Sequence, residues 1–350
     1  MVDPRAYQAM SQPVVGIRDD YFLEIMAEIQ AGLRDAFGTF NEATFPIPGG
    51  GGAGMEAAVS NFVLPGSKFA IFAAGLFADR MTLIGRRQRA NVVRLEKPWG
   101  EVFTAEEAEA FIERERPDVV GFVQAETSTG AYQSGRAITE AARKLNALVI
   151  ADSVTSLGAM PVELDSVGID VAYSCTQKGL SCPAGLSPIS ISPRAYDWLQ
   201  KRPEEPYTWN LDLGLISKYY EPAHAYHHTP SPPLYYALHQ GLAVIEEEAL
   251  QNRWARHKRA HHRLLTGLEE LGFQPFVKNP DHRIWHLTTV VPPAHVDEAA
   301  LRKKLLDRYD IEIASGLGRL SGKILRIGTM GPLATEENVD FLLDAIAACL

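Results

Sequence analysis

The sequence has few cysteines, no long apolar run and no excess of positive charge. Its three cysteines, Cys175, Cys182 and Cys349, are odd in number and lack the spacing of metal ligands. We therefore expect free thiols, no bound metal and a reducing compartment, the cytoplasm. No apolar stretch has the roughly 20 residues that a membrane-spanning helix needs. The formal net charge of −9 disfavours nucleic acids and anionic membranes as partners.

What the chain has is material for a large core, because 46% of its 350 residues are hydrophobic. Short apolar runs bounded by turn residues alternate with stretches of helical periodicity, and this alternation predicts an α/β fold. The predicted helices cover residues 21–37, 55–64, 77–87, 104–114 and 234–272. The predicted strands cover residues 69–73, 92–95, 119–124, 148–151, 169–174, 186–191, 285–291, 311–314 and 324–328.

An acid and an amine follow two of the predicted strands. The apolar run 148–151 ends on Asp152, and the run 169–174 is followed closely by Lys178. Open α/β sheets place their ligands at the carboxyl ends of strands. Pyridoxal phosphate needs a lysine for its Schiff base and a carboxylate for its pyridinium nitrogen, so the pair suits this cofactor. The alternatives are a solvated acid at a strand end and a surface lysine.

A glycine-rich loop precedes a predicted helix. Glycines 49–52 and Gly54 bring exposed N–H groups to a helix start, which favours an anion such as a phosphate. The same glycines also match G-x-G-x-x-G, a dinucleotide fingerprint. That alternative needs an acid at the end of the next strand, whereas the first acid after the strand 69–73 is Asp79, and Pro46 and Pro48 break the preceding strand. A surface turn without a ligand is the third interpretation.

Seven short segments, in order along nearly the whole chain, form a pattern. They are AETSTG (125–130), ADSVTSLG (151–158), TQKGL (176–180), PAGLSPIS (183–190), YHHTPS (226–231), IEIASGLG (311–318) and GKILRIG (322–328). Together they resemble the class V aminotransferases of PLP fold type I, and specifically their alanine–glyoxylate and serine–glyoxylate (serine–pyruvate) group. The resemblance implies a large domain with a mostly parallel seven-stranded sheet over residues 1–248, and a smaller α/β domain over residues 249–350.

The resemblance also implies roles for individual residues. Lys178 would hold the cofactor, Asp152 would face its ring nitrogen, and Arg326 would bind the substrate carboxylate. Further cofactor contacts would come from Gly50, Gly51, Gly52, Phe77, Thr127, Val154 and Gln177. A homodimer would share its active sites, because Tyr226 and Thr229 would reach the partner subunit's phosphate.

Simpler interpretations remain open for several of these residues. Phe77 could be a core residue, Thr127 a helix N-cap and Arg326 a paired surface arginine. The neighbouring pair His227 and His228 has no third ligand at a useful spacing. His257 and His261 lie one helical turn apart within a basic stretch, for which we predict a solvated helix face.

Two departures from the family pattern bear on activity. Relatives usually have Ser or Thr at the position of Gly50, so one phosphate contact is missing and cofactor retention is expected to weaken. The family also has a Gly-Pro-Gly-Pro segment before the first helix, which is not found ahead of Tyr21. We expect a truncated gene start, with a possible cost in activity.

The resemblance predicts amino-group transfer from a small amino acid, such as alanine or serine, to glyoxylate or pyruvate. Cysteine desulfurases and other lyases of the same fold are rivals, but desulfurases usually have His before the lysine, where this chain has Gln177. A PLP-binding protein that has lost catalysis is a second alternative. A dinucleotide-binding oxidoreductase is the distant third.

Overall fold

The computed structural model describes all 350 residues, and its largest sheet has seven strands in the order β1-β9-β8-β7-β4-β2-β3. Strands β8, β7, β4, β2 and β3 run parallel, whereas β9 pairs antiparallel with both β8 and β1. The predicted α/β fold with a mostly parallel seven-stranded sheet is therefore confirmed. Its strands are β1 (Ala43–Pro48), β2 (Lys68–Ala73), β3 (Asn91–Glu96), β4 (Val119–Val123), β7 (Leu148–Asp152), β8 (Val171–Tyr173) and β9 (Leu186–Ile191).

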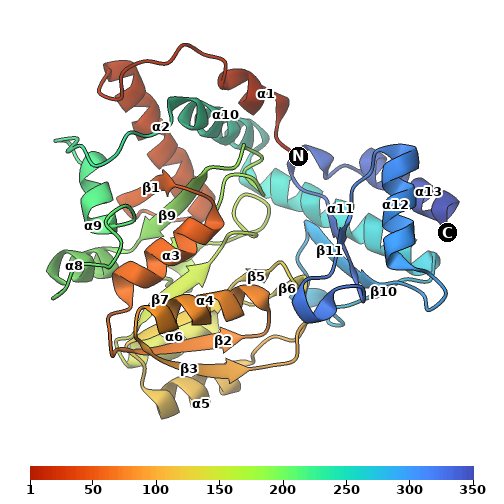
Figure 1. The fold of residues 1–350 in the computed structure, drawn as a ribbon, viewed down its shortest axis with the longest axis horizontal. Helices are drawn as coiled ribbons and strands as arrows, with labels where there is room; N and C mark the ends of the chain where they lie inside the picture. Colours follow the sequence, from red (N-terminus) through yellow and green to blue (C-terminus); the bar gives the residue numbers. More distant parts are fainter.

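Helices cover both faces of this sheet (Figure 1). One apolar cluster packs α2, α5, α6 and α10 against the sheet, and a second packs α3, α4 and α8. These helices are α2 (Asp20–Phe37), α3 (Gly51–Phe62), α4 (Leu76–Arg87), α5 (Ala105–Glu115), α6 (Arg136–Lys144), α8 (Pro193–Lys201) and α10 (Pro232–Glu248). Shorter elements are α1 (Pro4–Ala9), α7 (Leu164–Val167), α9 (Leu213–Ile216), η1 (Ser217–Tyr219) and the strand pair β5 (Ala125–Glu126) and β6 (Ala131–Tyr132).

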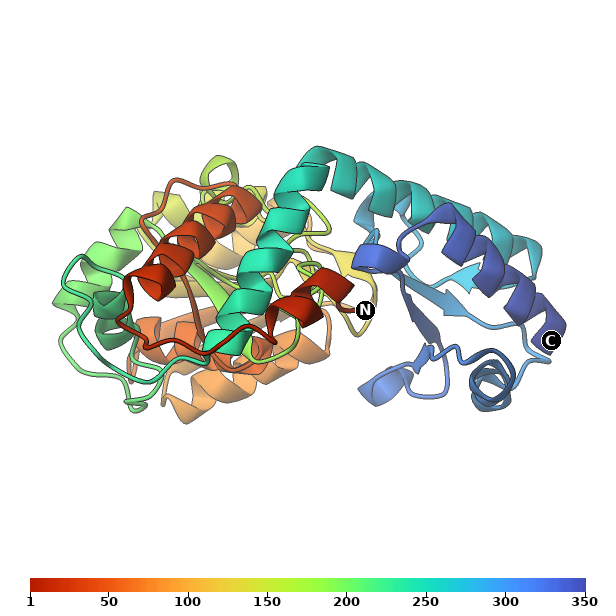
Figure 2. The same ribbon diagram turned by 90° about the horizontal axis from the view of Figure 1, so that it is seen from above.

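The C-terminal elements form an antiparallel sheet, β10-β11-β13-β12, with its own apolar cluster against α11, α12 and α13. They lie together on one side of the molecule, with α11 running towards them from the end of α10 (Figure 2). The predicted division between residues 248 and 249 stays a prediction. The elements are α11 (Leu250–Glu270), β10 (Gln274–Pro275), η2 (Pro280–His282), β11 (Leu287–Val291), α12 (Glu298–Tyr309), β12 (Ala314–Ser315), η3 (Gly318–Leu320), β13 (Leu325–Gly328), η4 (Gly331–Leu333) and α13 (Glu336–Cys349).

Two local predictions near the glycine-rich loop were wrong. The helix predicted from Met55 begins at Gly51, so Gly51, Gly52 and Gly54 belong to its first turn, whereas Gly49 and Gly50 precede it. Pro46 and Pro48 do not break β1, which has six residues and lies at the sheet edge. An edge strand tolerates proline because one of its sides makes no ladder hydrogen bonds.

The long helical region predicted over residues 234–272 is two helices. They meet at Ala249, whose φ of 62° ends α10 and starts α11 in a new direction. A non-glycine residue rarely adopts this conformation, and the amphipathic periodicity on either side gave no sign of it. None of the helices is both long and apolar enough to cross a membrane.

Candidate active site

Asp152 is the last residue of β7 and is only 2% exposed. Its Oδ1 accepts a hydrogen bond from the backbone N–H of Val154 (2.9 Å), and its Oδ2 accepts one from the hydroxyl of Tyr173 (3.0 Å). Tyr173 ends β8 and pairs in register with Asp152, so the parallel pairing brings the hydroxyl to the carboxylate. Sequence reasoning missed Tyr173, because one aromatic residue in a buried strand looks like any other core residue.

Burial raises the pKa of Asp152 from 3.8 to about 6, although its two hydrogen bonds and the charges of Lys178 and Arg80 oppose the rise. A carboxylate in such surroundings favours a cation placed beside it, since little water screens the attraction. A protonated pyridine nitrogen is a cation of this kind. The surroundings of Asp152 therefore fit the role that the resemblance gives it.

Lys178 lies five residues beyond the end of β8, and its ammonium group contacts side chains from three other segments. Its Nζ donates to the hydroxyl of Thr155 (2.7 Å) and to that of Thr127 (2.9 Å), and these hydroxyls are themselves 2.5 Å apart. Its Nζ also lies 5.8 Å from the centre of the Phe77 ring. The structure thus brings Lys178, Thr127 and Phe77 together, as predicted, and adds Thr155.

Burial lowers the pKa of Lys178, while Cys175, Asp152 and Glu126 oppose the shift and the nearby Arg326 adds to it. Both oxygens that accept hydrogen bonds from Nζ belong to neutral hydroxyls, which stabilise an ammonium less than a carboxylate would. The neutral amine is the form that attacks a carbonyl carbon. The site therefore favours the form of Lys178 that reacts with an aldehyde.

The glycine-rich stretch 49–54 lies beside this pair. Gly50 is the N-cap of α3, so the N–H groups of Gly51 and Gly52 have no acceptor within the helix. A Cβ on Gly51 would lie 2.7 Å from Cγ2 of Val154, so only glycine fits there. A Cβ on Gly50 would lie 3.8 Å from Nε2 of Gln177, whose amide is therefore close to the helix start. Free N–H groups at a helix start and a nearby amide are the donors that a phosphate needs.

The dinucleotide alternative does not fit this stretch. The fingerprint belongs to a parallel βαβ unit, in which the strand before the glycines lies within a parallel sheet. Here that strand is β1, which lies at the sheet edge and pairs only with β9, antiparallel. The surface-turn alternative fails as well, because Gly51 and Gly54 are buried in the first turn of α3.

Glu126 belongs to the site and was missed. It is 5% exposed, and its carboxylate accepts hydrogen bonds from Phe77 N–H (3.1 Å), Ser128 N–H (3.0 Å) and the Ser128 hydroxyl (2.6 Å). It thereby caps α4 and fixes the residue whose ring faces Lys178. Burial raises the pKa of Glu126, and the charge of Asp152 adds to the rise. An acid inside the segment AETSTG, directly after a buried strand, was the available signal.

A hydrogen bond between Thr127 and Arg326 joins the β5–β6 turn to the C-terminal sheet. Thr127 lies in the turn between β5 and β6, so the simpler alternative of a helix N-cap does not apply to it. Arg326 on β13 donates from Nη1 to the carbonyl of Thr127 (3.3 Å) and from Nε to that of Ser315 (2.8 Å). Its Nη2 has no partner within the chain. Arg326 is half-buried beside the site, and its Nη2 is the nitrogen left to donate to a carboxylate.

Tyr226 and Thr229 do not join this cluster within one chain. Both are exposed, and their hydroxyls are hydrogen-bonded to each other (3.1 Å). The neighbouring His227 stacks on Trp209 with ring centres 4.3 Å apart and lies 3.0 Å from His228, measured between Nδ1 atoms. No group of three metal-ligating side chains occurs here or elsewhere in the chain.

The solvated basic face predicted around His257 and His261 was wrong for both histidines, and Arg253, one turn before them, is buried as well. Arg253, His257 and His261 are each at most 4% exposed. Burial lowers the pKa of His257 to about 4 and that of His261 to about 3. The helix presents this side to the loops of the active site and to β11. The sequence alone could not indicate this, because an arginine is rarely buried unless it is paired.

Comparisons with known proteins agree with this geometry. The family model described as Aminotransferase class-V matches residues 9–342. This chain is a class V aminotransferase. The (S)-ureidoglycine–glyoxylate transaminase of Bacillus subtilis (strain 168) is 36% identical over 100% of this chain and 88% of its own length. The alanine–glyoxylate aminotransferase of Oryctolagus cuniculus is 34% identical over 99% of this chain and 89% of its own length.

The crystal structure of an alanine–glyoxylate aminotransferase from Nostoc sp. has a TM-score of 0.97 and 42% sequence identity to this class V aminotransferase, and the match covers 99% of this chain and 92% of that one. The predicted fold type I architecture is thereby confirmed. The cofactor is pyridoxal phosphate, and the site suits it chemically, since it offers an amine, a buried carboxylate, an aromatic face and the N–H groups of a helix start.

Proposed function

We propose that this class V aminotransferase transfers the amino group of a small amino acid, alanine or serine, to glyoxylate or pyruvate. The observation that carries the proposal is the placement of Lys178, whose amine lies beside Thr127, Thr155 and the Phe77 ring. Glyoxylate as the acceptor is supported by the names of the two relatives, both of which are glyoxylate aminotransferases.

The residues divide the work as follows. The bound cofactor supplies an electron-withdrawing ring, which stabilises negative charge at the Cα of the amino acid. Lys178 would hold the cofactor and, once released by the substrate, take the proton from Cα with its Nζ. Asp152 would keep the ring nitrogen protonated, and Phe77 would pack on the ring. Arg326 would orient the substrate through a bidentate or single contact with the α-carboxylate.

The phosphate would be held by Gly50, Gly51, Gly52 and Gln177. In this proposal Val154 packs against Gly51 and keeps the backbone of the glycine stretch beside the Asp152 strand. Thr127 would contact the side of the ring that carries the phenolic oxygen. The absence of a hydroxyl at Gly50 removes one donor, so the main-chain N–H groups of α3 carry more of the binding.

We also propose a homodimer with shared active sites. Tyr226 and Thr229 are polar, exposed and paired only with each other, which leaves them accessible to a partner subunit. In the same proposal residues 1–248 form the cofactor-binding domain and residues 249–350 the smaller domain. A cytoplasmic location is supported by the three cysteines, which are all free thiols.

A desulfurase remains the principal rival within the fold, and the cysteines argue against it. All three are buried. Burial raises the pKa of Cys175 to about 11 and that of Cys182 to about 12, whereas a nucleophilic cysteine needs a lowered pKa and access to the substrate. A protein that binds the cofactor without turnover is the other alternative, motivated by Gly50.

A matrix of donors and acceptors tests the proposal. The purified protein is mixed with alanine, serine or cysteine, and with glyoxylate, pyruvate or 2-oxoglutarate, while its visible absorption and the amino acids formed are measured. We expect the visible band to change with alanine or serine and glycine to form from glyoxylate. Sulfide release from cysteine would identify the desulfurase, and an unchanging band without product would identify the binding-only protein.

A further inference from the structure

The loop that carries Lys178 is packed against the loop that follows Asp152, backbone against backbone. We refer to residues 177–182 as the lysine loop and to residues 153–159 as the aspartate loop. A Cβ on Gly179 would lie 2.2 Å from the carbonyl oxygen of Leu157, and a Cβ on Gly158 would lie 2.9 Å from that of Gly179. The two loops therefore touch through their backbones, and their relative position sets the distance between the amine and the acid.

The lysine loop itself is a tight turn in a strained conformation. The N–H of Ser181 donates to the carbonyl of Lys178 (2.9 Å), which closes the turn. Ser181 has a φ of 57°, a left-handed conformation that costs a non-glycine residue free energy. Such a turn keeps its shape only where its surroundings hold it.

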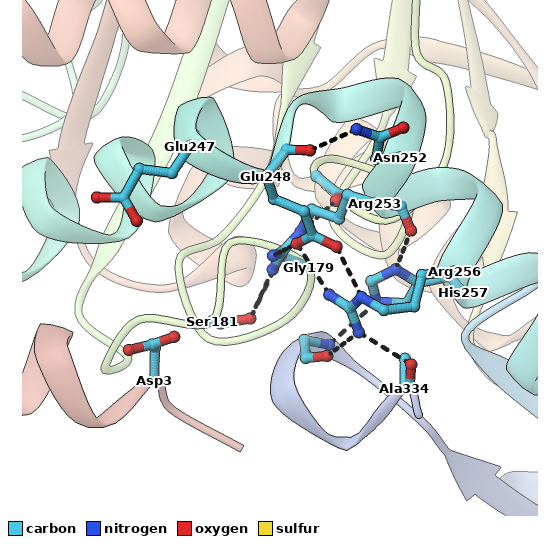
Figure 3. Close-up of polar contacts among 12 residues, drawn as sticks. Asp3, Gly179, Ser181, Glu247, Glu248, Asn252, Arg253, Arg256, His257 and Ala334 are labelled. Carbon is cyan, nitrogen blue, oxygen red and sulfur yellow. Dashed lines mark hydrogen bonds and ion pairs between the residues drawn. The ribbon is translucent and has the colours of Figure 1, made fainter. Parts of the chain in front are cut away.

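Arg253 from the first turn of α11 holds the lysine loop and the aspartate loop with three hydrogen bonds (Figure 3). It donates from Nε to the carbonyl of Gly158 (3.0 Å), and from Nη2 to the carbonyl of Gly179 (2.8 Å) and to the hydroxyl of Ser181 (2.9 Å). Its Nη1 donates to Glu248 (2.9 Å). One guanidinium thus joins the aspartate loop, the lysine loop and the end of α10.

The burial of Arg253 shows that this arrangement is specific. Arg253 is only 2% exposed. A buried guanidinium is costly unless its N–H groups are paired, and here all three nitrogens have acceptors. The planar fork of arginine reaches several oxygens at fixed angles, which the single ammonium of a lysine cannot reproduce.

We propose that Arg253 is a positioning residue for Lys178: by holding Gly158, Gly179 and Ser181 at fixed positions it keeps the lysine amine aligned with the cofactor. This inference rests on the proposed function only in that Lys178 carries the cofactor. Arg253 touches neither cofactor nor substrate, and it acts from the helix that leads into the C-terminal elements. The conformation of that helix start is thereby coupled to the geometry of the reacting amine.

Arg256 is the matched control on the same helix. It pairs with the same Glu248 (2.6 and 2.9 Å), but its other hydrogen bonds go to the carbonyls of Gly331 (2.8 Å) and Ala334 (2.9 Å), and none goes to the lysine loop (Figure 3). Removing Arg256 therefore disturbs the ion pair and the helix without removing a contact to Gly158, Gly179 or Ser181.

The experiment compares Arg253→Lys and Arg253→Met with Arg256→Met in the holoenzyme. The visible absorption of the lysine-linked cofactor is titrated with pH, and the dissociation constant of the cofactor is measured. We expect the apparent pKa of the band to shift by about one unit and cofactor retention to weaken by about tenfold or more in both Arg253 variants, with little change in Arg256→Met.

Hydrogen exchange in the cofactor-free protein gives a second measurement that does not depend on the cofactor. Amides of residues 157–160 and 178–182 should exchange faster in the Arg253 variants than in Arg256→Met. A folded Arg253→Lys with the wild-type titration, retention and exchange would overturn the inference. Failure of both Arg253 variants to fold would overturn it too, because the residue would then serve the whole fold.

A failure of the proposed function can be distinguished from a failure of the positioning role of Arg253. It would appear as a wild-type protein that does not transfer amino groups, whatever the Arg253 variants do to the exchange of the two loops. A wild-type enzyme that turns over normally, together with Arg253 variants that match Arg256→Met in every measurement, would refute the positioning role alone.

Discussion

Two basic side chains of this aminotransferase, Arg253 and Lys178, are linked through the lysine loop and differ in what surrounds them. Arg253 is bonded to a carboxylate, two carbonyls and a hydroxyl, so each of its nitrogens has an acceptor. Lys178 has two neutral hydroxyls, and burial lowers its pKa. The fold thus gives Arg253, which holds a loop in place, a full set of acceptors. Lys178, the group that reacts, has weaker hydrogen-bond partners.

The acids of the same two regions repeat the contrast. Burial opposes the ionisation of Glu248, yet Arg256 and Arg253 together lower its pKa. Asp152 has only a backbone N–H and a tyrosine hydroxyl as partners, and burial raises its pKa to about 6. The paired acid Glu248 contributes to the fold. Asp152 has no cationic partner of comparable strength within the chain, so its carboxylate can pair with the protonated ring nitrogen of the cofactor.

Of the substitutions that test the contrast between Arg253 and Lys178, we expect the loss of Lys178 to have the largest effect. In Lys178→Ala we expect amino transfer to fall by about 1,000-fold or more, because the attachment point and the base at Cα are lost together. Activity is measured as glycine formed from glyoxylate. The matched change of the exposed Lys323→Ala should leave the rate unchanged, and a Lys178→Ala enzyme that retains a tenth of the wild-type rate would contradict the assignment.

Asp152→Asn should lower the rate of amino transfer and raise the stability of the cofactor-free protein. We expect a loss of about 10- to 100-fold in rate, the effect of one charge-assisted hydrogen bond. Because the folded-state pKa is raised from 3.8 to about 6, the neutral acid stabilises the cofactor-free fold at low pH, and this contribution is lost as the pH rises through 6. The uncharged asparagine should therefore stabilise the cofactor-free protein at pH 7 by up to about 3 kcal/mol.

Urea unfolding of the cofactor-free protein measures that gain, with Asp344→Asn as the exposed control. A cofactor-free Asp152→Asn protein that is less stable than the wild type at pH 7 would show that the carboxylate is better satisfied than the structure indicates. Equal rates for Asp152→Asn and the wild type would remove the acid from the site.

The smallest expected effect belongs to the buried histidines of α11. The pKa of His257 is lowered from 6.5 to about 4, so the unfolded chain takes up a proton before the folded protein does. Stability should therefore fall as the pH drops from 6.5 to about 4, with each such histidine contributing up to about 1.4 kcal/mol per pH unit.

His257→Gln tests this slope, because glutamine can still donate and accept a hydrogen bond. Unfolding free energies between pH 4 and 6.5 should depend less on pH in this variant, whereas the exposed His262→Gln should follow the wild type. An unchanged slope in His257→Gln would show that its ring is not held neutral by burial.

Sequence reasoning found six of the seven strands of the large sheet, the strand-end pair and the glycine stretch because each has a local signal. The strand predicted over residues 311–314 was wrong except at Ala314, where β12 begins. Apolar runs mark buried strands, and an acid or amine directly after such a run has a defined place at the sheet edge. The helix predicted over residues 104–114 likewise occurs, as α5, and it starts with a capping box formed by Thr104 and Glu107. The start of α3 was placed four residues late because glycine has a low helix propensity, and tertiary packing against Val154 overrides it.

The contacts between distant segments left no such signal. Thr155 meets Lys178, Tyr173 meets Asp152, and Arg253 meets Gly158 and Gly179, each through pairings that depend on the assembled sheet. Composition argued in the wrong direction for α11, since a stretch rich in arginine and histidine normally faces water. Only the packing of the helix against the two loops reveals which of its basic residues are buried.

The most direct test of the account is to find where the cofactor is attached. The holoenzyme is treated with borohydride, which makes the link to the lysine permanent, and is then digested and sequenced by mass spectrometry. We expect the added mass on Lys178, in the peptide that contains Thr176 and Gln177. A modification on any other lysine, or a reduced protein that carries none, would contradict the central claim.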